Sequence, residues 1–315
     1  MKKRMTGIIA AAGVLIFCSG CGLGNTEENA EYTLRMAEIM PKEHPSAMAS
    51  QYFADLVREK SGGRIRIQVY YNEKLGDADE ILDQTRYGGI AFSRVNSLSA
   101  VEMVPSLEAE YTKHAYENPD SMMNWLENDR EQIVGAFQEE ELEPLSWFYP
   151  DYRCFYNATE KINDIDDFRG LKIQTMETKF MQSSMKRLAA TAVTVNKEDL
   201  YRSMKTEYVN AGETSFGEFV LGDYYPLVTY VTLSNYIAAP DLIVASRPCM
   251  ESMSEDDRKM IVECAGEAAV YQREQMKEFQ TKYMEKTQEE KDFFLESDNF
   301  SDQLKIVLNR NTDEN

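Results

Sequence analysis

The sequence predicts an α/β protein built from two domains. Strand, helix and strand patterns follow one another within about 40 residues near the start of the mature chain, and this order is typical of a parallel sheet. The chain has 315 residues, and after removal of an N-terminal leader its length fits about two domains. Later strand patterns return after a long excursion, so the chain should leave one sheet and come back to it.

The N-terminus has the layout of a bacterial export signal. Basic residues at 2–4 precede an apolar run at 7–17 that is too short to span a membrane. Residues 18–21, Cys-Ser-Gly-Cys, resemble a lipobox with Cys where Leu is usual, so we expect Cys21 to carry a lipid anchor. A plain secretory signal cleaved elsewhere is the alternative. Residues 1–21 are therefore interpreted as a lipoprotein signal peptide, and residues 22–31 as a polar tether.

Composition excludes several classes of function. The formal net charge is −20 at pH 7, which makes nucleic acid a poor partner. An anionic ligand would have to be held by local basic groups. His44 and His114 are the only histidines and lie far apart, which excludes a histidine-rich metal site. No phosphate-binding glycine loop, GxSxG or HExxH motif occurs, so we expect no cofactor, no metal and no catalytic residue.

Cysteine usage fits an exported protein without a disulfide framework. After Cys21 the chain holds Cys154, Cys249 and Cys264, an odd number without a CxxC pair. A disulfide between Cys249 and Cys264 is possible, but three free thiols are the preferred interpretation.

The N-terminal third predicts three parallel strands joined by helices. Residues 46–63 place Met48, Tyr52, Phe53 and Leu56 on one helical face, and the Ser-Gly-Gly at 61–63 ends that helix. The other elements expected here are strands at residues 32–40, 64–72 and 90–95 and a helix at residues 77–89.

The middle of the chain predicts a second set of elements. Residues 117–141 are helical in pattern, and residues 145–157 read as one extended crossing segment. After these come a helix at residues 178–190, a strand at 191–195, a helix at 197–205 that Asn196 can cap, and two strands within 230–246.

A long helix is expected from residue 254. Ser254 and Asp257 have the spacing of a capping box, and no strong helix breaker follows before about Ser297. A helix of about 40 residues would be about 60 Å long, more than one small domain can cover. It should therefore lie across both domains; two helices with a bend are the alternative.

Residues 166–176, "DDFRGLKIQTM", contain a short strand with a polar centre. After the glycine, Leu171, Ile173 and Thr175 alternate with Lys172, Gln174 and Met176, so the two sets point to opposite faces. Gln174 would present a neutral amide to a cleft.

Four stretches in order resemble the solute-binding proteins of tripartite ATP-independent periplasmic (TRAP) transporters: residues 43–82, 153–176, 200–213 and 253–274. "SGGRIRIQVY", the later "LGD" and "DDFRGLKIQ" carry most of the resemblance. It implies a periplasmic-binding-protein-like fold of the Venus-flytrap type, with a long C-terminal helix bridging the domains. Domain I would comprise residues 32–150 plus 238–276, and domain II residues 151–237 plus 277–315. A cleft between them would close on a small ligand.

The resemblance also points to ligand-binding residues. In that family the strand after "GLKI" presents an Arg that pairs with a ligand carboxylate, whereas this chain has Gln174. Replacing the guanidinium by an amide should weaken the binding of a carboxylate by on the order of 1 to 3 kcal/mol. Either the ligand carries a hydroxyl or amide here, or another cation replaces the Arg. Arg153 is the first candidate for that cation. Arg94 could enter the same cleft or be a surface arginine paired with acids.

The remaining candidates are weaker. Glu213 matches the acid of a family loop that reads "VNAGE" here, at residues 209–213, and a structural role for it is an equal alternative. Thr214 follows at a place where a polar residue reaches ligand in the family. Asn235 and Tyr236 lie on the segment that returns to the first domain and would suit sugar hydroxyls or an acyl chain.

The expected function is an extracytoplasmic receptor, lipid-anchored to the cell membrane, that is not an enzyme. It would capture a sugar acid, dicarboxylate or related polar solute and deliver it to the integral-membrane permease subunits of a TRAP transporter. One alternative is a ligand-binding subunit that feeds a membrane sensor. The other is an extracytoplasmic enzyme acting on a sugar acid.

Overall fold

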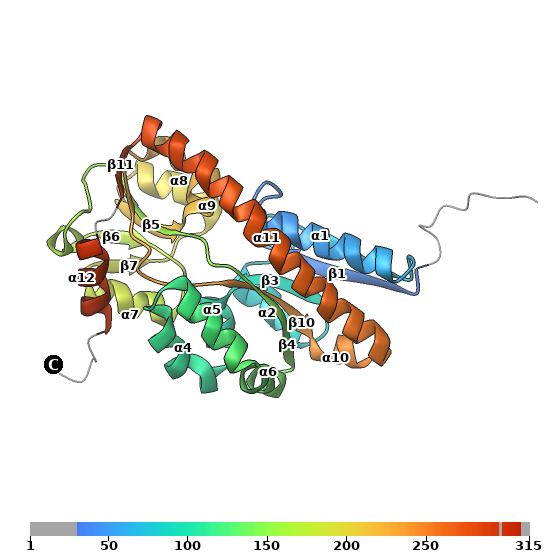
Figure 1. The fold of residues 1–315 in the computed structure, drawn as a ribbon. Coiled ribbons are helices and arrows are strands. Elements are labelled where there is room, and N and C mark those ends of the chain that lie inside the picture. Colours follow the sequence, from blue (N-terminus) through green and yellow to red (C-terminus); the bar gives the residue numbers. More distant parts are fainter. Residues whose placement is uncertain (1–29, 296–297, 310–315) are drawn as a thin grey trace, which may run out of the picture.

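The computed structural model describes residues 30–295 and 298–309. The predicted signal peptide, Cys21 and most of the tether lie outside the described residues. The described elements form two mixed sheets with helices packed around them (Figure 1). Among the described helices, none is both long and apolar enough to cross a membrane.

The first sheet, sheet A, contains the predicted N-terminal strands and two later ones. Its order is β2 (Ile65–Tyr70), β1 (Tyr32–Glu38), β3 (Phe92–Asn96), β10 (Asp241–Ser246) and β4 (Leu142–Phe148). The strand β1 is parallel to β2 and β3, whereas β10 is antiparallel to β3 and β4. The helices that follow these strands are α1 (Pro45–Lys60), α2 (Ala78–Arg86), α3 (Ser97–Glu102), α4 (Glu108–Ala115), α5 (Pro119–Asn128), α6 (Arg130–Glu139) and α10 (Arg247–Glu251).

The second sheet, sheet B, has the order β11 (Asp292–Leu295), β9 (Tyr230–Leu233), β5 (Arg153–Asn157), β8 (Ala211–Ser215), β6 (Lys172–Gln174) and β7 (Thr191–Val193). The strand β5 is antiparallel to β8 and β9, and β6 is parallel to β7 and β8. Its helices are α7 (Lys179–Arg187), α8 (Lys197–Lys205), α9 (Phe216–Leu221) and α12 (Asp298–Asn309). Short 3₁₀ turns lie at Pro105–Leu107, among the helices of sheet A, and at Ile165–Phe168 and Tyr225–Leu227, among the elements of sheet B.

One helix spans both sheets. The helix α11 (Glu255–Glu290) has 36 residues without a break, which corresponds to about 54 Å. Ser254 caps it by accepting a hydrogen bond from the Asp257 backbone N–H at 3.1 Å. Figure 1 shows α11 running from α10 past α1 to α9 and β11. The structure thus confirms the expected long helix and excludes the alternative of two helices with a bend.

Two short segments connect the sheets. Residues 149–152 join β4 to β5, and residues 234–240 join β9 to β10. The side chain of Gln272 on α11 holds the first segment, accepting from the Tyr149 N–H at 3.1 Å and donating to the Tyr149 carbonyl at 3.2 Å. The sequence had predicted one extended segment over residues 145–157, and the structure divides it into β4 and β5 of different sheets.

Three further details differ from the sequence-based expectations. Residues 209–213, expected as a loop, supply part of β8, an interior strand of sheet B. The long helix ends at Glu290, before the expected residue, and β11 follows it. The helix α8 has the predicted bounds, but the side chain of Asn196 makes no capping hydrogen bond.

Cys154, Cys249 and Cys264 are free thiols, as the sequence analysis preferred. The exact domain boundaries remain a prediction.

Candidate functional site between the two sheets

The two sheets turn polar edges toward each other. On sheet A, β1 and β3 end at this edge and β10 begins there, with Asp241 paired to Phe148 of β4. On sheet B, β6 and β8 end at the facing edge and β5 begins there. Connections of four and seven residues, 149–152 and 234–240, keep the edges close. In open α/β sheets, ligands bind at the carboxyl ends of the strands.

A buried ion network occupies the edge of sheet A. The guanidinium of Arg94 is fully buried and donates from Nε to Glu38 Oε2 at 3.0 Å, from Nη2 to Glu38 Oε1, and from Nη1 to Asp241 Oδ2 at 3.2 Å. Glu38 also accepts from the Ser50 hydroxyl at 2.6 Å. Burial alone would lower the pKa of Arg94, but Glu38 and other nearby acids outweigh it and raise the pKa.

This network forms because alternate residues on adjacent strands share a face. Glu38 lies beside Arg94 in the register of β1 and β3, and Ile243 lies opposite Arg94 on β10. Asp241 is two residues from Ile243 and therefore points to the same face as Arg94. Arg94 is thus a buried, fully paired cation rather than a surface arginine.

The edge of sheet B holds a second buried ion pair. Arg153 donates from Nε to Glu213 Oε1 at 2.8 Å and from Nη2 to Glu213 Oε2 at 2.6 Å. Both side chains are almost completely buried, and Thr175 donates its hydroxyl to Glu213 Oε2 at 3.3 Å. The two parallel hydrogen bonds make this a strong, geometrically fixed pair. Glu213 therefore has a clear structural partner, and a direct role of either residue in ligand binding remains a prediction.

Asn235 and Tyr236 lie beside this pair. The side-chain oxygen of Asn235 accepts a hydrogen bond from the Arg153 backbone N–H at 3.2 Å, so Asn235 fixes the crossing segment 234–240. The ring of Tyr236 is fully buried and stacks on Phe155 with ring centroids 5.1 Å apart. Burial and the nearby charge of Glu213 raise the pKa of the Tyr236 hydroxyl well above its usual value.

Gln174 lies on the opposite face of sheet B from the Arg153–Glu213 pair. The register places Gln174 beside Gly212 and Gly212 beside Tyr156, whereas Glu213 is paired with Phe155. The Tyr156 hydroxyl donates to Gln174 Oε1 at 2.9 Å. The ring crosses over Gly212, where a Cβ would lie 2.0 Å from Tyr156 Cζ. Tyr156 therefore fixes the side-chain oxygen of the half-buried Gln174, and the NH₂ group of Gln174 is the part of the amide that could donate to a ligand.

Thr214 positions an acid that the sequence did not single out. Its hydroxyl donates to Glu218 Oε2, and Glu218 lies in the first turn of α9. The half-buried Glu218 carboxylate is one of the charges that raise the pKa of both Arg94 and Arg153. It therefore lies within electrostatic reach of both edges. The one sequence signal for Glu218 is its position three residues after Ser215, the spacing of a capping box at the start of a helix.

Asp151 is a further missed residue, on the segment between β4 and β5. Its carboxylate accepts from the Gly217 N–H at 2.6 Å, from the Tyr152 N–H at 2.7 Å and from Gln280 Nε2 at 2.7 Å. These donors come from α9, the segment itself and α11, so Asp151 ties three elements together. Burial raises the pKa of Asp151 to about 6, although its hydrogen bonds oppose the shift.

The raised pKa of Asp151 predicts a pH dependence of stability. A carboxyl whose folded pKa exceeds its unfolded value of about 3.9 adds stability below the unfolded pKa and loses it as pH rises through the folded pKa. We expect the free energy of unfolding, parent minus Asp151→Asn, to fall by about 2 kcal/mol between pH 4 and pH 7. Urea titrations at several pH values measure this difference. A difference that stays constant with pH would contradict the assignment.

The two halves of the molecule touch on both sides of these edges. On one side, a Cβ at Gly217 of α9 would lie 2.5 Å from Nε2 of His44, the N-cap of α1. On the other side, the Tyr116 hydroxyl lies 2.8 Å from the Ser184 hydroxyl of α7, and the Tyr116 ring stacks on Phe180 at 5.2 Å. Contacts of this kind are expected of a closed form.

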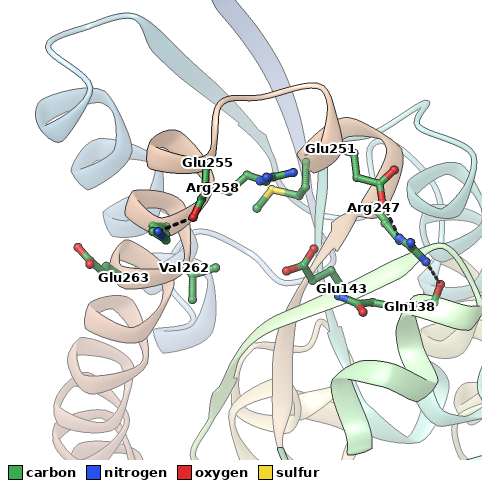
Figure 2. Close-up of a pocket in the computed structure, with 10 residues that line it drawn as sticks. Gln138, Glu143, Arg247, Glu251, Glu255, Arg258, Val262 and Glu263 are labelled. Carbon is green, nitrogen blue, oxygen red and sulfur yellow. Dashed lines mark hydrogen bonds and ion pairs between the residues drawn. The ribbon is translucent and has the colours of Figure 1, made fainter. Parts of the chain in front are cut away.

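A separate cavity lies at the other edge of sheet A. It has a volume of about 540 Å³ and is lined by α10, the start of α11 and the beginning of β4. Figure 2 shows Glu143, Arg247 and Arg258 around it, with Glu251 paired to Arg247. Since β10 runs from Asp241 to Ser246, this cavity and the interdomain edges lie at opposite ends of the same strand.

Known proteins similar to this chain are bacterial solute-binding proteins. A solute-binding protein of Chromohalobacter salexigens is 27% identical over 273 residues, covering 86% of this chain and 81% of the relative. A solved TRAP periplasmic solute-binding protein from the same organism, with bound D-glucuronate, is 25% identical with a TM-score of 0.79, covering 88% of this chain and 92% of that one.

A second solved structure shows the same fold at lower sequence identity. The TRAP periplasmic solute-binding protein of Roseobacter denitrificans, with bound β-D-glucuronate, has a TM-score of 0.81 at 20% identity and covers 88% of this chain and 92% of that one. The family model for bacterial extracellular solute-binding protein, family 7, matches residues 36–303. The chain therefore belongs to this family, the solute-binding proteins of TRAP transporters.

Proposed function

We propose that this protein captures a small polar organic solute between sheets A and B and delivers it to the permease subunits of a TRAP transporter. The observation that carries the proposal is the family match over residues 36–303, together with two polar strand edges that face each other across two short connections. Two similar solved proteins hold a glucuronate. The sequence of residues 18–21 supports attachment of the receptor to the outer face of the membrane through Cys21.

Capture would work by a shift between open and closed forms. A ligand that touches both edges makes its full set of contacts only when the halves are together, so it stabilises that form. The contacts of Tyr116 with Ser184 and of His44 with Gly217 would be made on closure. The segment 149–152, held by Gln272 and Gln280 of α11, would bend between the two forms.

Ligand-dependent transport tests this function. We expect purified protein to release a small organic compound on denaturation, and mass spectrometry identifies it. That compound at 100 times its dissociation constant should raise the free energy of unfolding by about 2.7 kcal/mol. In vesicles containing the cognate permease, uptake of the compound should require the receptor and an ion gradient.

The controls separate the rival functions. Compound recovered chemically unchanged after long incubation argues against an enzyme. A receptor that binds the compound but supports no uptake with its permease would contradict delivery and favour a sensor subunit.

A further inference from the structure

The amide of Gln174 stands at the edge of sheet B that faces sheet A. Gln174 is the last residue of β6 and is half-buried. The chain continues from it to α7, whose first residue, Lys179, donates its backbone N–H to the carboxylate of Glu102. Glu102 ends α3, the helix that follows β3 of sheet A. The strand β6 therefore ends where the two halves meet, and its last side chain is placed to contact a solute held between them.

Tyr156 fixes which end of this amide is available. The Tyr156 hydroxyl donates to Gln174 Oε1 at 2.9 Å. Its oxygen would lie 2.2 Å from a Cβ at Gly212, so the ring lies directly over that glycine. The ring also stacks on Phe219 and Tyr224, with centroids 5.2 and 5.1 Å away. An amide carries its acceptor oxygen and its donor nitrogen on the same carbon, so holding Oε1 directs Nε2 away from Tyr156.

Tyr224 sets the direction of this hydrogen bond. Burial raises the pKa of both Tyr156 and Tyr224 well above the usual value, so both hydroxyls keep their protons. The Tyr224 hydroxyl opposes the shift of the pKa at Tyr156, which is the effect of a donor to the Tyr156 oxygen. A phenol that accepts from one neighbour gives its single proton to the other. The chain from Tyr224 through Tyr156 therefore ends on the oxygen of Gln174 and leaves the nitrogen as the donor.

This donor is not used within the described part of the chain. Over residues 30–295 and 298–309, Gln174 Nε2 makes no hydrogen bond. A half-buried NH₂ group loses its water when the two halves close on a solute, and it then needs an acceptor to replace that water. The position of Gln174 allows the solute to supply that acceptor.

The acid nearest to this amide in the strand register disfavours a carboxylate as the acceptor. The register places Gly212 beside Gln174, and Thr214, two residues along β8, points to the same face of sheet B. Thr214 donates to the half-buried carboxylate of Glu218, which therefore lies on this face as well. A ligand carboxylate at Gln174 would bring a second negative charge to a partly desolvated face.

Nearby cations are not placed to compensate. Arg153 lies on the opposite face of sheet B and is paired there with Glu213. Lys172 shares the face of Gln174 but is exposed at the start of β6, away from the interdomain edge. On sheet A, Arg94 is fully buried and paired with two acids. An acceptor at Gln174 would thus meet a neutral donor without a partner cation.

We propose that Gln174 donates to an uncharged oxygen of the ligand, so that the receptor selects a sugar or polyol over the corresponding sugar acid. Tyr156 is a positioning residue that acts through Gln174. This inference rests on the proposed function, because it takes the interdomain edges to hold the solute.

Pairs of compounds that differ at one carbon test the inference. The pairs are glucose and glucuronate, galactose and galacturonate, and sorbitol and gluconate. Calorimetric titration is run on the parent, on Gln174→Arg, and on Gln138→Arg as a control, because Gln138 is a half-buried glutamine of the separate cavity. We expect the neutral member of at least one pair to bind the parent at least about tenfold more tightly than its acid. Gln174→Arg should shift this ratio toward the acid by at least about tenfold, and Gln138→Arg should keep it.

Tyr156→Phe tests the positioning role, because it keeps the ring and removes only the hydroxyl. It should weaken binding of the preferred neutral compound by about threefold or more and leave the affinity for its acid unchanged. A nitrogen–proton spectrum adds a direct signature: the preferred neutral compound should shift the Gln174 NH₂ signal of the parent, which is identified by its absence in Gln174→Arg.

Four results would overturn the inference: tighter binding of the acid in every pair, no binding of any neutral member, an unchanged ratio in Gln174→Arg, or binding of the neutral compound without a shift of the Gln174 signal. Equal affinities of Tyr156→Phe and the parent would reject the positioning role. A preference for the acid would leave the receptor function standing. Failure of receptor-dependent uptake, by contrast, would reject the receptor function whichever compound the site prefers.

Discussion

Replacing Arg153 with alanine should lower the free energy of unfolding by about 3 to 5 kcal/mol. The substitution leaves Glu213, whose side chain is 0% exposed, without its partner, and breaking a buried pair from one side costs this much. Thr175 provides only one weak hydrogen bond at 3.3 Å in compensation. Urea unfolding of the ligand-free protein, followed by circular dichroism, measures the loss.

Two further variants give this result its meaning. Arg169→Ala breaks an exposed pair with Asp166 and should change stability by less than about 1 kcal/mol. The double variant Arg153→Met, Glu213→Leu removes both charges and should recover much of what Arg153→Ala loses, because no unpaired charge is left buried. If Arg153→Ala is as stable as Arg169→Ala, then Arg153 is not committed to Glu213 and is available to a ligand.

Replacing Gly212 with alanine should destabilise the protein by about 3 kcal/mol or more. The added Cβ would lie 2.0 Å from Tyr156 Cζ and 2.2 Å from its hydroxyl oxygen. The ring cannot move aside easily, because it is fully buried and stacks on Phe219 and Tyr224 with centroids 5.2 and 5.1 Å away. Overpacking of this kind forces off-rotamer side chains or a shift of the strand. Thermal and urea unfolding both measure the effect.

Gly266→Ala is the matched control for Gly212→Ala. Gly266 lies inside α11, and a Cβ there meets nothing within 4 Å. Alanine at this helical position should stabilise the protein by up to about 1 kcal/mol. Equal effects of the two substitutions would show that the Tyr156 ring does not lie over Gly212, and would remove the explanation for how Gln174 is held.

Local patterns predicted most helices and strands of the fold. The helix α11 follows from its Ser254 cap and the lack of breakers, and β1, α1 and β2 follow from their periodicity and the glycines at 62 and 63. The misses are short or depend on distant partners. The strand β11 has four residues, too few for a periodic signal, and β8 becomes a strand because it lies between β5 and β6.

The site was harder to predict, because its contacts depend on register. Alternation places Gln174 on one face of β6, but only the pairing with Gly212 and Tyr156 shows that this is the face away from Glu213. Similarly, Arg94 is paired with acids 56 and 147 positions away in the chain. No local pattern distinguishes such an arginine from one on the surface. The sequence analysis therefore named Arg94 as a candidate but could not predict that it is buried or which acids it pairs with.

A crystal structure with the co-purified ligand is the most direct test of this account. It should show the ligand between the facing edges of sheets A and B, with Arg94 still bound to Glu38 and Arg153 still bound to Glu213. A ligand carboxylate bound by the Arg153 guanidinium, with Glu213 displaced from it, would contradict the account.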